Sequence, residues 1–233
     1  MCGRLFIKSD ARRLAELFAS AAPGPDVSAL EGFKPRYNGA PGQVFPLVAR
    51  NPETGKGQFI RALWGFIPEW MKDPKGGHRP INAKSETVTT NGMFRNAYRK
   101  GRALLPVDGF FEWQAIKGAQ GKQPYAIAMK SGEPFSLAAI WEVWSNPETG
   151  KPVRTFAIVT CPANEMMNEI HHRMPVIVAP ENHDRWIGEE SSPDDLLKPF
   201  PSELMAMWPI GRKVNSPAND DPGILDPLDG QES

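Results

Sequence analysis

Short runs of apolar and β-branched residues, separated by Gly, Pro, Asn and Asp, recur along most of the chain. Such runs predict strands, because their length and the turn residues between them are typical of β-rich domains. The expected strands cover residues 44–49, 59–66, 103–107, 110–114, 125–129, 135–141, 155–160, 176–179 and 205–208. The hexapeptide Asn-Pro-Glu-Thr-Gly-Lys occurs at 51–56 and again at 146–151, and its turn chemistry predicts a hairpin loop at both places.

Helical patterns are few and short. Ser9 or Asp10 can cap a helix that runs to about Ala21, and further short helices are expected at 163–170 and 182–187. Many strands with few helices predict an α+β fold, built around a curved, mostly antiparallel sheet or open barrel.

Composition favours one folded domain over residues 1–215. The chain has 233 residues, of which 40% are apolar, enough for a sizeable core. Cys2 and Cys161 are its only cysteines, which suits a reducing compartment and argues against a disulfide-stabilised secreted protein. Without a signal sequence or a long apolar segment, we expect a cytoplasmic protein with no membrane partner.

Charge is unevenly distributed along the chain. Residues 216–233 hold five of the 27 acidic side chains, several Pro and Gly and no Lys or Arg, which predicts a disordered acidic tail. Residues 1–215 therefore hold 27 basic and 22 acidic side chains. A local basic cluster contains Arg95, Arg99, Lys100 and Arg102, and indicates either a solvated face or a contact with nucleic acid.

Cys2 is the residue with the most distinctive chemistry. Removal of Met1 would leave a thiol and an α-amine on one residue, with reference pKa values of about 8.5 and about 7.7–8.0. The amine of such an aminothiol can form a Schiff base with an aldehyde, and the thiol can then close a five-membered thiazolidine. Cysteines elsewhere in a chain lack the free amine and cannot do this.

Three polar segments place reactive groups among apolar neighbours, at 81–87, 106–113 and 170–175. In that order, they contain an amide, a carboxylate between aromatic residues, and an imidazole beside a guanidinium. A carboxylate that is desolvated in this way can carry protons near neutral pH. Each also has a structural interpretation, as a turn residue, a solvent-facing strand residue or a core histidine. The adjacent His171 and His172 do not predict a metal site, because neighbouring residues seldom point at one ion and no further ligands are evident.

Taken together, these motifs resemble the signature of the SOS-response-associated peptidase family, over roughly residues 2–210. The matching motifs, in sequence order, are Met1-Cys2-Gly3-Arg4, residues 36–41, residues 63–70 and the three polar segments. The resemblance implies a single β-rich domain that binds single-stranded DNA, crosslinks itself to abasic sites and removes its own initiator methionine. No cofactor is implied, and we expect a monomer that associates with the nucleoid when it acts on DNA.

The family's active-site residues correspond to Cys2, Asn82, Glu112 and His171. The resemblance implies that the Cys2 amine attacks the sugar aldehyde, that Glu112 transfers protons and that His171 assists ring opening or reversal. Asn82 would orient the N-terminal residue and the sugar. Loss of the β-phosphate from the Schiff base, before ring closure, would instead give lyase activity.

Motif position further implies that Arg4, Lys84 and Arg173 contact phosphates near the lesion. Lys84 stands where many relatives are expected to have Arg, so it keeps the charge and loses bidentate geometry. His172 stands where Asp is often expected, which leaves open which imidazole is catalytic. His171 is preferred because it lies two residues before Arg173, as in the motif.

Aromatic residues complete the expected DNA surface. Trp64 and Trp70 provide either base-stacking or core-packing surfaces. The loop 91–95, which ends at Arg95, could hold a wedge beside the abasic site.

Two other function classes remain open from the residues. An N-terminal-nucleophile amidohydrolase would also need a processed Cys2, which would attack an amide with its own amine as base. A non-covalent single-strand binding module would make Cys2 incidental.

Overall fold

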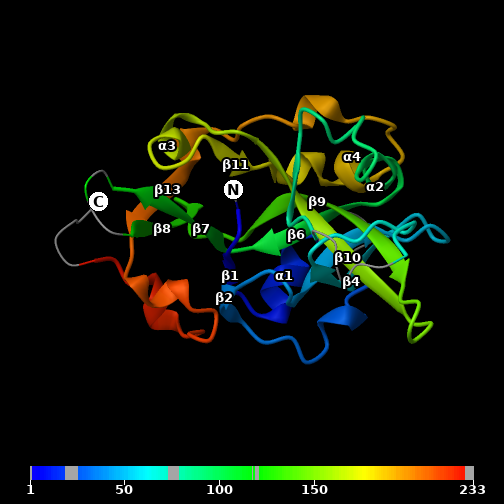
Figure 1. Cartoon of the computed structure of the whole chain (residues 1–233), viewed down its shortest axis with the longest axis horizontal. Coiled ribbons are helices and arrows are strands. Elements are labelled where there is room, and N and C mark those ends of the chain that lie inside the picture. Colours follow the sequence, from blue (N-terminus) through cyan, green and yellow to red (C-terminus); the bar gives the residue numbers. More distant parts are fainter. Residues whose placement is uncertain (1, 19–25, 73–78, 117, 119–120, 229–233) are drawn as a thin grey trace.

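The computed structural model describes residues 2–18, 26–72, 79–116, 118 and 121–228. The strands form two sheets, which lie on the left and right of Figure 1. The strands are β1 (Leu5–Ile7), β2 (Arg36–Gly39), β3 (Val44–Arg50), β4 (Gly57–Trp64), β5 (Asn82–Lys84), β6 (Arg102–Val107), β7 (Gly109–Ala115), β8 (Lys122–Met129), β9 (Phe135–Ser145), β10 (Pro152–Pro162), β11 (Arg173–Pro175), β12 (Ile177–Val178) and β13 (Met205–Pro209).

The larger sheet closes into a five-stranded barrel. Its order is β11-β10-β4-β3-β6-β9-β12, and β10 also pairs with β9, so that β10, β4, β3, β6 and β9 form a ring. The pairing of β10 with β4 is parallel, whereas the other pairings in the ring are antiparallel. The predicted curved, mostly antiparallel sheet in an α+β domain is confirmed, with the barrel closed and not open.

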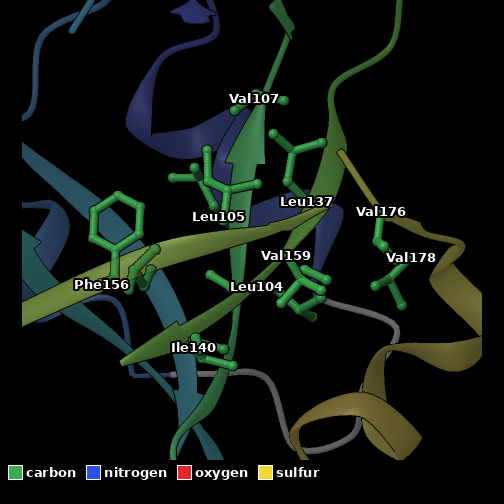
Figure 2. Close-up of a cluster of buried hydrophobic side chains, with 14 of the residues drawn as sticks. Leu104, Leu105, Val107, Leu137, Ile140, Phe156, Val159, Val176 and Val178 are labelled. Carbon is green, nitrogen blue, oxygen red and sulfur yellow. The ribbon is translucent and has the colours of Figure 1, made fainter. Parts of the chain in front are cut away.

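Apolar side chains from the ring strands form a large part of the main hydrophobic core. Figure 2 shows Leu104 and Leu105 of β6 beside Leu137 of β9 and Phe156 of β10. All four side chains are fully buried. Burial of each such side chain stabilises the fold by about 1.5–3 kcal/mol, so this core holds the strands that carry the site.

The smaller sheet has the order β13-β8-β7-β1-β2 and is antiparallel throughout. In this sheet β1 lies between β2 and β7, which places the start of the chain centrally. Figure 1 shows the N-terminus in the middle of the molecule, between the two sheets.

Both copies of the repeated hexapeptide form hairpin loops, as predicted. The first joins β3 to β4 and the second joins β9 to β10. The side chains of Asn51 and Asn146 each accept a hydrogen bond from the backbone N–H two residues later. Gly55 and Gly150 have φ values of +69° and +65°, a left-handed conformation that glycine adopts without strain.

Three of the described helices are shorter than the sequence pattern predicted, and the helix at Arg95–Lys100 was not predicted. The described helices are α1 (Ala11–Leu17), α2 (Arg95–Lys100), α3 (Glu165–Asn168) and α4 (His183–Ile187). Asp10 caps α1 as expected, and residues 19–21 of the predicted helix lie outside the described residues. Within the described part of the chain, no helix combines the length and the apolar character that a membrane crossing requires.

Residues 212–228, here called the C-terminal strap, are packed against the smaller sheet. The strap contains two 3-10 helices, Arg212–Asn215 and Pro222–Leu225, and is the orange to red segment of Figure 1. Asp220 accepts hydrogen bonds from the backbone N–H groups of Tyr37 and Asn38, and Ile224 is buried. The expectation of disorder from residue 216 is therefore wrong for residues 216–228, because acidic side chains serve as backbone acceptors there; residues 229–233 lie outside the described residues.

Candidate active site

Cys2 lies three residues before the start of β1, and its backbone is held by a residue of the larger sheet. The side-chain Nδ2 of Asn82 donates a hydrogen bond of 2.9 Å to the Cys2 carbonyl oxygen. The Trp64 indole in turn donates to the carbonyl of Ile81, which fixes the segment that carries Asn82. The Asn82 amide thus contacts the backbone of Cys2, the residue that it was expected to orient.

Strand β10 supplies the frame on which the site is assembled. Beyond its contact with β4, it pairs on one edge with β5, where Thr160 lies opposite Lys84. On its other edge it pairs with β11, where Pro162 lies opposite Arg173. Two of the polar segments singled out in the sequence are therefore held on either side of one strand.

Burial dominates the chemistry of the Cys2 thiol. The residue is fully buried, and loss of hydration raises the pKa of the thiol well above its usual range. The negative charge of Glu112, a buried residue of β7, raises this pKa further. The thiol therefore stays protonated at neutral pH, and its addition to a carbon requires a group that accepts the proton.

His171 belongs to the same electrostatic cluster. Burial lowers its pKa, while the charge of Glu112 raises it. Nδ1 of His171 lies 2.9 Å from the backbone nitrogen and 3.2 Å from the backbone oxygen of Arg173. It accepts from the nitrogen when the neutral ring carries its proton on Nε2, and it donates to the oxygen when the proton is on Nδ1. A neutral imidazole with Nε2–H can donate to an oxygen of a sugar.

His172 is exposed, and its ring stacks on that of His171 with the centroids 4.5 Å apart. The interaction of His171 with Glu112 favours His171 as the catalytic imidazole. Among the described residues, no three His, Cys, Asp or Glu side chains gather as a metal site would require.

Arg173 is held on all sides by the protein. Its side chain is only 9% exposed and makes a two-pronged ion pair with Glu86, with Nη2 3.0 Å from Oε2. Nη2 also donates to the backbone oxygen of Thr160 at 2.6 Å. The ion pair lowers the pKa of Glu86 to about 2. Sequence reasoning expected a phosphate contact at Arg173 and missed its partner, although Glu86 lies within the quoted segment 81–87.

Arg4 is also engaged by the protein. Its Nη1 donates to Oδ1 of Asn38 and to the Val214 oxygen of the strap, at 2.7 Å each. Its guanidinium lies 5.8 Å from the centre of the Trp113 ring. Asn38, which is 1% exposed, joins β2 to the strap and was quoted in the sequence motif without a role.

The remaining DNA candidates divide into exposed and buried residues. Lys84 and Arg95 are exposed, and Trp70 is 59% exposed. Trp64 is 1% exposed and stacks on Phe156, so it is a core residue and not a base-stacking surface.

The basic cluster and the loop 91–95 are partly structural. Arg102 is buried, and its nitrogen atoms donate to the backbone oxygens of Tyr98, Trp186, Gly188 and Glu190. Phe94 is buried against Phe66, with the ring centres 5.5 Å apart. Phe94 is therefore a core residue in this structure and does not project as a wedge.

Comparison with known proteins gives a consistent result. The model of the family described as SOS response associated peptidase (SRAP) matches residues 1–217. The abasic site processing protein YoqW of Bacillus subtilis is 34% identical over 231 residues, which cover 97% of this chain and 99% of the relative. The abasic site processing protein HMCES of Gallus gallus is 29% identical over 265 residues, which cover 98% and 78%.

A crystal structure of a protein from Bacteroides thetaiotaomicron has the same fold. It superimposes with a TM-score of 0.82 at 26% identity, over 97% of this chain and all of the other. Together with the family match over residues 1–217, this likeness shows that the chain belongs to the SOS response associated peptidase family.

Proposed function

We propose that the protein processes abasic sites in single-stranded DNA by forming a covalent link through Cys2. The observation that carries this proposal is the enclosure of Cys2, with Asn82 bonded to its carbonyl and with Glu112 in electrostatic reach of both its thiol and His171. The relatives named abasic site processing proteins support the same substrate.

The reaction begins with hydrolysis of the Met1–Cys2 peptide bond, which the protein performs on itself and which frees the α-amine. The unprotonated amine adds to the open-chain aldehyde of the abasic sugar, and the carbinolamine loses water to give an imine. Glu112 carries the protons of these steps, since the departing hydroxyl must leave as water. In the tautomer that carries its proton on Nε2, His171 donates to the ring oxygen when the sugar opens.

Ring closure forms the stable product. The Cys2 sulfur adds to the imine carbon, the thiol proton passes to Glu112 and on to the imine nitrogen, and a thiazolidine results. The net loss from aldehyde and aminothiol is one water molecule. Elimination of the β-phosphate from the imine gives strand cleavage instead, so lyase activity reports imine that escapes closure.

Single-stranded DNA is held by charge and by stacking. Arg4, Lys84, Arg95 and Arg173 contact phosphates, which positions a strand without reading its sequence. The exposed indole of Trp70 offers a stacking surface that tolerates any base.

The deciding experiment mixes purified protein with single-stranded DNA that contains one abasic site and resolves the products on a denaturing gel. Intact mass establishes the N-terminal residue of the same preparation. We expect a heat-stable shifted band with the wild type and none with Cys2→Ala or with undamaged DNA. Absence of a covalent band from protein that lacks Met1 would refute the proposal and favour non-covalent DNA binding.

A further inference from the structure

In the Glu86–Arg173 pair the cation is buried and the anion is partly exposed. The Arg173 side chain is 9% exposed and is anchored to Thr160 from behind, by bonds to its backbone oxygen and to Oγ1. The Glu86 side chain is 47% exposed and lies in the turn that follows β5. Its carboxylate therefore covers the solvent side of a guanidinium that cannot itself turn outward.

The same guanidinium suits a DNA phosphate. A planar Arg fork binds carboxylate and phosphate oxygens in the same two-pronged geometry. Arg173 lies two residues from His171, and its backbone N–H is bonded to the His171 ring. A DNA strand held at the active site therefore passes within reach of the Arg173 side chain. Its Nε is buried without a hydrogen-bond partner, so the fork has a donor that Glu86 does not use.

We propose that Glu86 occupies a phosphate subsite on Arg173 in the DNA-free protein and is displaced when DNA binds. This inference rests on the proposed function and adds that Glu86 sets the affinity for the strand. Exchange of a carboxylate for a phosphate keeps Arg173 neutralised in both states. Arg173 therefore contributes little to the release of counterions, and its contact with DNA is weaker than that of an unpaired arginine.

Glu86→Gln tests the inference, because it keeps the shape of the side chain and removes the competing charge. The measurement is fluorescence anisotropy with an undamaged single-stranded oligonucleotide at several salt concentrations. We expect about fivefold tighter binding at low salt, the order of one partly exposed ion pair. The plot of log affinity against log salt should also steepen by about 0.7, the value for one additional contact with single-stranded DNA.

Glu169→Gln is the matched control. Glu169 is exposed and lies two residues before His171, and it takes part in none of the ion pairs between described residues. This variant removes the same charge near the site without freeing an arginine, and should change affinity by less than about twofold. Equal effects of the two variants would show general charge repulsion and overturn the inference.

A second substitution locates the effect at Arg173. In the Arg173→Gln background, Glu86→Gln should no longer tighten binding; persistent tightening would overturn the inference. If Arg173→Gln fails to fold, Glu86→Asp replaces it and should keep the wild-type salt dependence, since a carboxylate remains. Unchanged affinity of Glu86→Gln beside a wild type that crosslinks refutes only this inference, whereas a wild type that binds no DNA refutes the proposed function as well.

Discussion

Asn38→Ala is expected to release the C-terminal strap and lower the stability of the whole domain. Nδ2 of Asn38 lies 2.7 Å, 3.0 Å and 3.2 Å from the backbone oxygens of Asn219, Ser216 and Val214, while Oδ1 accepts from Arg4. The amide has two N–H bonds, so the substitution removes the equivalent of two donors and one acceptor. At about 1 kcal/mol for each buried hydrogen bond, the free energy of unfolding should fall by about 3 kcal/mol.

Equilibrium unfolding in urea measures this change, and limited proteolysis shows whether cleavage moves into the strap. Asn219→Ala is the matched control, because Asn219 is an exposed residue of the strap whose side chain makes one bond, to the Lys213 oxygen at 2.8 Å. We expect the control to lose less than about 1 kcal/mol. An Asn38→Ala loss no larger than that of the control would refute the reasoning and show that the strap does not depend on this amide.

Three further outcomes are expected. Gly109→Ala should destabilise the protein by about 3 kcal/mol or more in the same urea assay, because a Cβ there would collide with the Phe6 ring and a backbone oxygen of β8; wild-type stability would contradict the geometry. Burial lowers the pKa of His183 to about 4, whereas the same imidazole in the unfolded chain takes up a proton below about pH 6.5. The free energy of unfolding should therefore fall as the pH drops from about 6.5 to 4, and it should fall less for His183→Gln than for the wild type. If the two proteins lose stability in parallel with pH, His183 is not the cause. Burial raises the pKa of Cys161 to about 12, so iodoacetamide followed by mass spectrometry should label it only on unfolding, and rapid labelling of native protein would disprove its enclosure.

The strands of the barrel could be predicted from sequence because their patterns are local. Runs such as 44–49 and 103–107 contain enough apolar and β-branched residues to indicate a strand without knowledge of the partner. Most of the missed strands are very short, since β1, β5 and β11 have three residues each and β2 has four. Such short segments are extended because longer strands pair with them, which is a tertiary effect that no local pattern contains.

The site was predicted as separate motifs, and the structure adds how they contact one another. A bond from Asn82 to the Cys2 carbonyl joins residues 80 positions apart, and the sequence gives no distance for it. Trp64 was a candidate for base stacking and is buried in the core. The motif alone could not decide this, because an aromatic side chain suits core packing and stacking on a base equally well. Composition also misled at the strap, where acids typical of disorder bind backbone N–H groups.

The frame around Cys2 has a consequence for biosynthesis. Asn82 bonds the Cys2 carbonyl, Glu112 acts on the thiol through its charge and links it to His171, and the strap that holds Arg4 extends to residue 228. A ribosome adds roughly 5–20 residues per second, so the full set of partners exists only some ten to fifty seconds after Cys2 is made. Cys2 is thus among the first residues to be synthesised and among the last to be enclosed. On the proposed self-removal of Met1, its nitrogen stays in the Met1–Cys2 amide throughout that interval, so the aminothiol is withheld from cellular aldehydes until the site has formed.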